Sequence, residues 1–240
     1  MQGSKPRRGF LAWRRPRASA WGAMLDRQDI LLAALSLQQT GCARVVVFEH
    51  LRAPDGLVHP AERDQWLVQT LRGPGAHLPA RLRTMALALS EDRCRQGEYA
   101  WDGLSDPRGL EMEVQLEAAA AWGVAPEAVG FDFRVLQAPS AAATPVHWAA
   151  CLREELLMWR QHARQAGWRL PVVEPERQAA QRAVLCLRGD ALPNWAEAPQ
   201  DWQFSLTPAR GMADVDWVQL QAGPQWRALV ACGAALGALL

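Results

Sequence analysis

Lysine is almost absent from this chain: Lys5 is the one lysine among 26 basic residues, and all the others are arginine. Schiff-base enzymes, pyridoxal phosphate enzymes and Walker-type P-loops each use a lysine side chain at the reacting site. The stretch around Lys5, GSKP, has neither the glycine spacing of a P-loop nor a helical pattern after it. The sequence therefore excludes these three kinds of site.

Other chemical motifs are missing as well. No serine lies in a G-x-S-x-G motif, and no G-x-G-x-x-G motif follows an expected strand. The cysteines are odd in number and never spaced C-x-x-C, so we expect small buried side chains in a reducing compartment. We predict neither a metal nor a cofactor. The five cysteines are Cys42, Cys94, Cys151, Cys186 and Cys232.

Long apolar runs are also absent. The most apolar stretch, 226–240, is too short for a membrane span and includes Arg227, so we expect a core helix there. The apolar stretch 9–13 is too short for the core of a signal peptide. These two absences predict a cytoplasmic protein.

The charges nearly cancel, with 26 basic against 25 acidic residues, which predicts no nucleic-acid partner. The local exception is the N-terminal segment 1–22, which contains basic residues and no acidic residue. The first acidic residue of the chain is Asp26. We expect a disordered tail, with contact to anionic lipid as the alternative. The cations of this segment are Lys5, Arg7, Arg8, Arg14, Arg15 and Arg17.

The apolar pattern alternates between strand and helix periods, which predicts a mixed α/β or α+β protein. Half of the residues are hydrophobic, which is enough for a core. Strands are expected within 23–37, 43–51, 83–101, 128–137 and 170–175, and helices within 61–72, 108–122, 146–166, 176–187 and 226–240.

Several polar residues have a structural and a chemical interpretation. His147 and Cys151 would share one face of the expected helix 146–166, but no second pair completes a metal site, so packing is favoured. Glu154 and Glu155 fit a solvated helix face, and Asp132 fits a salt bridge. An enzyme acting through acids such as Asp132 and Glu154 stays open if they gather in a cleft.

Several segments of the chain, in their order along the sequence, resemble the type IV pilus assembly protein PilM. The pattern consists of a helix ending in Glu117-Ala118, a strand with Asp132-Phe133, and a helix closing in 166–168. A V-x-x-E strand and an A-x-x-R-A-type helix follow, and the last helix is also similar. The additional residues of the pattern are Val173, Glu176, Ala179, Arg182 and Ala183.

The resemblance implies a truncated actin-like (ribonuclease H-like) fold of the FtsA type. Residues 23–188 would form the first lobe, with a small subdomain inserted at about 80–138, and 189–240 would be a shortened remnant of the second lobe with the C-terminal helix. In such proteins the first hairpin carries a D-x-G-S/T phosphate loop. Here the matching residues are Asp26, Arg27, Gln28 and Asp29, which lack the glycine and the hydroxyl.

We therefore expect a vestigial phosphate loop, with Asp29 adding repulsion, and a scaffold that is not an enzyme. The alternatives are an active ATPase of the same family and a component related to the type II secretion protein GspL. The resemblance implies a position at the cytoplasmic face of the inner membrane and a PilN-like membrane partner. Its N-terminal peptide would bind an apolar groove between subdomain and lobe, largely through main-chain hydrogen bonds. We expect Leu110, Val114 and Ala118 at this site.

Overall fold

The fold is taken from a computed structural model of the chain. It describes residues 19–25, 29–38, 41–57, 59–103, 106–136, 143–188, 199–208, 211 and 215–239, and all structural statements concern these residues.

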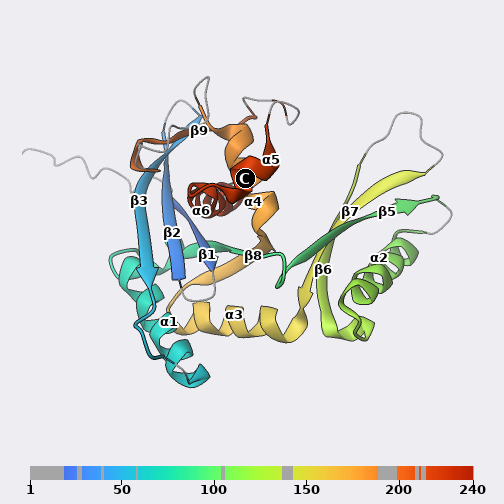
Figure 1. Cartoon of the computed structure of the whole chain (residues 1–240), viewed down its shortest axis with the longest axis horizontal. Coiled ribbons are helices and arrows are strands. Elements are labelled where there is room, and N and C mark those ends of the chain that lie inside the picture. The colour runs from blue at the N-terminus through green and yellow to red at the C-terminus, as the bar shows by residue number, and fades with distance from the viewer. Residues whose placement is uncertain are drawn as a thin grey trace, which may run out of the picture.

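A mixed sheet of six strands forms the body of the protein, in the order β8-β4-β1-β2-β3-β9 (Figure 1). The strands β1, β2, β3 and β9 are antiparallel neighbours, whereas β4 and β8 run parallel to β1. The mixed sheet with its helices confirms the prediction of a mixed α/β fold. The bounds are β1 Ser19–Leu25, β2 Asp29–Leu37, β3 Cys42–Arg52, β4 Thr84–Leu89, β8 Arg169–Pro175 and β9 Gln203–Ser205.

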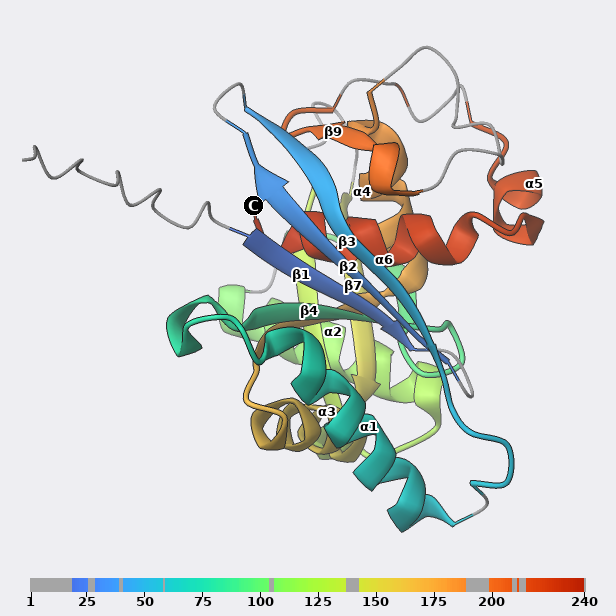
Figure 2. The ribbon, with the colours of Figure 1, turned by 90° about the vertical axis from the view of Figure 1, so that its left-hand side faces the viewer.

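Helices cover both faces of this sheet (Figure 2). Side chains alternate between the faces of a strand, so Ala23 and Leu25 pack toward α1 and α3 while Met24 packs toward α4 and α6. Both faces of β1 are therefore buried. The bounds are α1 Pro60–Gly75, α3 Arg153–Gln165, α4 Glu176–Cys186 and α6 Trp226–Gly237.

Helix α6 lies unusually close to its neighbours because glycines stand at both contacts. A Cβ atom on Gly22 of β1 would overlap the backbone of α6 at Ala231 and Ala235. A Cβ atom on Gly233 of α6 would overlap the carbonyl group of Ala179 in α4. The helix thus joins the centre of the sheet to α4 through backbone-to-backbone packing.

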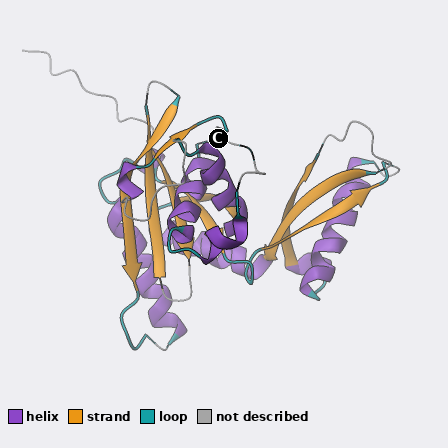
Figure 3. Cartoon of the chain, turned by 45° about the horizontal axis from the view of Figure 1, so that its top comes forward, coloured by secondary structure: helices purple, strands orange, loops and turns teal. Residues whose placement is uncertain are grey.

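A second sheet of three antiparallel strands, in the order β5-β7-β6, stands beside the body (Figure 3). Helix α2 packs on one face of it; the helix starts after the N-cap Asp106, which accepts a hydrogen bond from the Gly109 N–H, and ends at the left-handed Gly123. The other face carries no helix in the described residues. The bounds are β5 Arg95–Trp101, α2 Pro107–Trp122, β6 Val129–Val135 and β7 Thr144–Leu152.

Three expectations differ from the observed structure. The small sheet and α2 span 95–152, not 80–138, because β4 lies in the body sheet between β1 and β8. Residues 144–152 form strand β7, and the helix begins only at Arg153. In the described part of 189–240, β9 and α6 complete the body itself and form no separate lobe.

The remaining elements are short. Of the helices in the described residues, none combines the length and the hydrophobicity that crossing a lipid bilayer requires. The short elements are the 3-10 turns η1 Ala80–Leu82, η2 Pro126–Ala128 and η3 Pro199–Asp201, and helix α5 Trp217–Ala222.

Candidate partner groove and strand-end pocket

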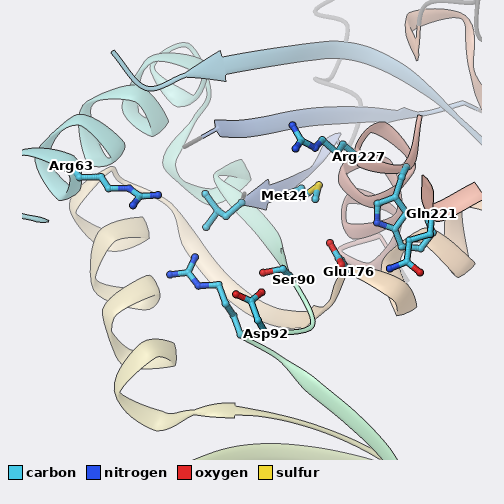
Figure 4. A pocket seen from close by; sticks show the side chains of 10 residues that line it. Met24, Arg63, Ser90, Asp92, Glu176, Gln221 and Arg227 are labelled. Atoms are coloured by element: carbon cyan, nitrogen blue, oxygen red, sulfur yellow. The ribbon is translucent and has the colours of Figure 1, made fainter. Parts of the chain in front are cut away.

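A pocket of about 770 Å³ lies where the parallel strands β1, β4 and β8 end. Ligands of open α/β sheets bind outside the carboxyl ends of such strands. Arg63 of α1 and Arg227 of α6 reach it from opposite sides, and Ser90 and Asp92, which follow β4, lie between them (Figure 4). The pocket thus holds charges of both signs.

Of the expected phosphate loop, Asp26, Arg27 and Gln28 lie outside the described residues. Asp29 is described, and its side chain is only 13% exposed. Its carboxylate accepts a hydrogen bond from His50 Nε2 at 2.9 Å and lies 3.6 Å from Arg227 Nη1 and 3.8 Å from Arg52 Nε. Cations therefore surround Asp29, and the repulsion expected from it is offset locally. The vestigial loop stays a prediction.

The residues expected at the partner site lie in the core of the small subdomain. Leu110, Val114 and Ala118 are 3%, 0% and 0% exposed and pack from α2 onto β7. They hold the helix to its sheet, and a peptide outside the core cannot touch them. The surface that a partner contacts must be formed by other residues.

A groove of about 850 Å³ does lie between the subdomain and the body. Its floor is the face of the small sheet that α2 leaves uncovered. Cross-strand registers order this floor in rows: Glu98, His147 and Arg134 oppose one another in one row. Gln96, Ala149 and Asp132 form the next row. The floor is mostly polar, unlike the apolar groove that we expected.

The opposite wall of the groove consists of the edge strand β8 and the first turns of α4. Glu174 of β8 accepts two hydrogen bonds from Arg182 of α4, at 2.8 and 2.6 Å, and Arg182 also donates to the Gly233 carbonyl at 2.9 Å. Burial lowers the pKa of Arg182, but the hydrogen bonds and charge of Glu174 outweigh it and raise that pKa overall. This pair fixes the wall to α6.

The other candidate residues do not assemble into a catalytic site. His147 and Cys151 lie on strand β7; His147 Nε2 is 3.6 Å from Glu98, whereas Cys151 is buried, and burial followed by the Glu155 charge raises its pKa to about 11. Asp132 lines the groove and Glu154 does not. Among the described residues, no three potential ligands gather as for a metal ion.

Most of the groove residues were missed because four separate segments of the chain build the groove. Period-two alternation in 129–135 did show that Asp132 and Arg134 point away from the core. No such signal marks Arg177 or Gln178, whose place depends on how α4 stands against the small sheet.

The sequence matches no protein-family model and no curated protein. Among solved structures, the chain is similar to one in a PilM–PilN type IV pilus biogenesis complex, with 20% identity and a TM-score of 0.56 over 71% of this chain and 51% of that chain. It is also similar to the cytoplasmic domain of EpsL, an inner-membrane component of the type II secretion system of Vibrio cholerae, with 14% identity and a TM-score of 0.48 over 87% and 76% of the two chains.

A third similarity is to RuvC of T. thermophilus in complex with a Holliday junction, with 11% identity and a TM-score of 0.38 over 90% and 91% of the two chains. The match to the PilM–PilN complex shows the fold: this chain has an actin-like fold and spans about half the length of the chain that it matches.

Proposed function

We propose that this protein is a non-catalytic scaffold of a type IV pilus assembly machine at the cytoplasmic face of the inner membrane. It would bind the cytoplasmic N-terminal segment of a PilN-like membrane protein in the groove between the small subdomain and the body. The observation that carries this proposal is the groove itself, about 850 Å³ between an uncovered sheet face and the wall of β8 and α4.

The similarity to a chain that is solved together with PilN supports the proposal. The position of the site supports it as well, because a groove lined by an edge strand and an uncovered sheet face suits an extended peptide. Apolar side chains such as Ala149, Val172 and Val173 lie among the polar ones that line it. The groove can therefore accept alternating side chains of both kinds.

A role without catalysis is supported by how the groove acids are engaged. Glu174 is bound by Arg182 at 2.6 Å, Glu98 lies 3.6 Å from His147, and Asp132 accepts a hydrogen bond from its neighbour Phe133. A general acid or base must lie within hydrogen-bond reach of the proton that it transfers. These three carboxylates instead have structural partners.

The proposal can be tested with a fluorescein-labelled peptide that copies the cytoplasmic N-terminus of a PilN-like inner-membrane protein from the same organism. Fluorescence anisotropy should show saturable binding to the full chain. Ala149→Glu places a bulky charge at the centre of the groove floor and should abolish binding. Ala120→Glu, on the exposed side of α2, is the matched control and should bind as the wild type does.

No binding by the wild type, or equal binding by Ala149→Glu, would contradict the proposal. Circular dichroism spectra that match the wild type must accompany the comparison, so that a lost signal reports the groove and not unfolding.

An ATPase of the same fold is the second candidate, because the 770 Å³ pocket with Arg63 and Arg227 lies where a ligand of this sheet would bind. We expect no such activity, since a phosphate cradle needs several converging N–H donors and a metal. Titration calorimetry with Mg-ATP distinguishes the scaffold from the ATPase, and micromolar affinity would favour the ATPase.

A further inference from the structure

Some of the charged side chains that line the groove have an ion-pair or hydrogen-bond partner, and others have none. Its three acids have partners, as described above: His147 for Glu98, Arg182 for Glu174 and a backbone N–H for Asp132. Two arginines in the same groove do not. Neither Arg134 nor Arg177 has an ion pair or hydrogen bond to any residue in the described part of the chain.

One of these arginines belongs to the floor of the groove and the other to its wall. Arg134 belongs to β6, in the floor row with His147 and Glu98, whereas Arg177 lies in the first turn of α4 on the opposite side. Both side chains are exposed in the free protein. A peptide that filled the groove would remove water from both guanidinium groups, and uncompensated burial of a charge is costly.

The edge of β8 offers a peptide few backbone donors. Pro171 and Pro175 of the edge strand β8 have no N–H group. We expected main-chain hydrogen bonds to supply much of the affinity, but this edge limits them and gives the side chains a larger share.

We infer that the peptide bound in this groove carries an Asp or Glu side chain that pairs with Arg134 and Arg177. This inference rests on the proposed function and specifies its partner further. A planar guanidinium group binds a carboxylate through two hydrogen bonds, and two such groups on facing walls can bind both of its oxygens. Lysine or arginine at the same peptide position would be repelled by both guanidinium groups.

The test uses two labelled peptides: the N-terminal segment of the PilN-like membrane protein from the same organism, and the same segment with each Asp and Glu replaced by Asn and Gln. The neutralised peptide should bind the wild type at least about tenfold more weakly. The double variant Arg134→Gln/Arg177→Gln should lose a similar factor for the acidic peptide and should no longer distinguish the two peptides. Arg108→Gln, an exposed arginine of α2, is the control and should behave as the wild type.

The outcomes separate the two proposals. If the wild type binds neither peptide, the proposed function fails and this inference fails with it. If it binds both equally, or if the double variant still prefers the acidic one, the groove binds a peptide but the acidic anchor is wrong. A partner segment with no acidic residue that nevertheless binds in the groove would also overturn the anchor.

Discussion

The body sheet and the small sheet differ in how their faces are used. The six-stranded sheet has helices on both faces, and β1, β2 and β4 are almost entirely buried. The three-stranded sheet buries one face under α2 and leaves the other to line the groove. The body sheet is therefore held by packing on both sides, whereas one face of the small sheet is open to the groove.

The largest loss of folding free energy is expected from a side chain added between α6 and α4, where their backbones are in contact. Gly233→Val would push a side chain into the Ala179 carbonyl, where backbone cannot move aside. We expect a loss of more than about 3 kcal/mol of folding free energy, measured by urea unfolding. Val218→Ala, at a position 82% exposed on nearby α5, should change it by no more than about 0.5 kcal/mol.

The small sheet should be disrupted separately from the body. Leu110→Ala removes a buried side chain of α2 and should destabilise the subdomain by about 3 kcal/mol. Hydrogen exchange should then rise in β5, β6 and α2, while β1 and β2 keep their protection. Met112→Ala, 62% exposed on the same helix, is the control. Equal loss of protection in both sheets would show that they unfold as one unit.

The groove wall formed by β8 and α4 is stabilised by the ion pair of Glu174 and Arg182. Glu174→Gln removes a carboxylate that is 6% exposed and leaves Arg182 half-satisfied, so we expect a loss of about 2 kcal/mol. Unfolding curves of the wild type, Glu174→Gln, Arg182→Gln and the double variant give the coupling energy. Additive effects of the two single changes would contradict a direct interaction.

The smallest expected effect is in thiol labelling of the folded protein. Cys42 is partly exposed, whereas Cys94, Cys151, Cys186 and Cys232 are buried, and burial raises the pKa of each buried thiol. The thiolate is the reactive form, so at pH 8 the buried thiols should react slowly. Maleimide labelling followed by mass spectrometry should modify Cys42 first, and Cys42→Ser should remove that fast reaction.

Local patterns predicted most elements of both sheets, because alternation and helical spacing are properties of short segments. The failure at 144–152 has a physical cause. Val146, Trp148 and Ala150 alternate as in a strand, but Cys151 and Leu152 continue the apolar pattern directly into α3. A buried strand that runs without a turn into a helix has no boundary signal, so the two merged into one expected helix.

The candidate site was less predictable than the fold. The resemblance placed a groove between subdomain and lobe, but the residues assigned to it came from the regular face of α2, which is the core face. Arg134 and Arg177 line the same groove only because β6 and α4 border it from different sides. Contact between segments so far apart is a property of the tertiary structure, and one sequence contains no spacing that reveals it.

The position of α6 has a consequence for how the chain folds as it is synthesised. Strand β1 is synthesised long before α6, yet it packs on this helix. Contacts between residues so distant in the chain form slowly, because the entropy of closing the loop opposes them. The small sheet with α2 needs only residues 95–152 and can form earlier. The small sheet would then exist before the body is complete, and one face of a nascent β1 would stay uncovered until α6 is made.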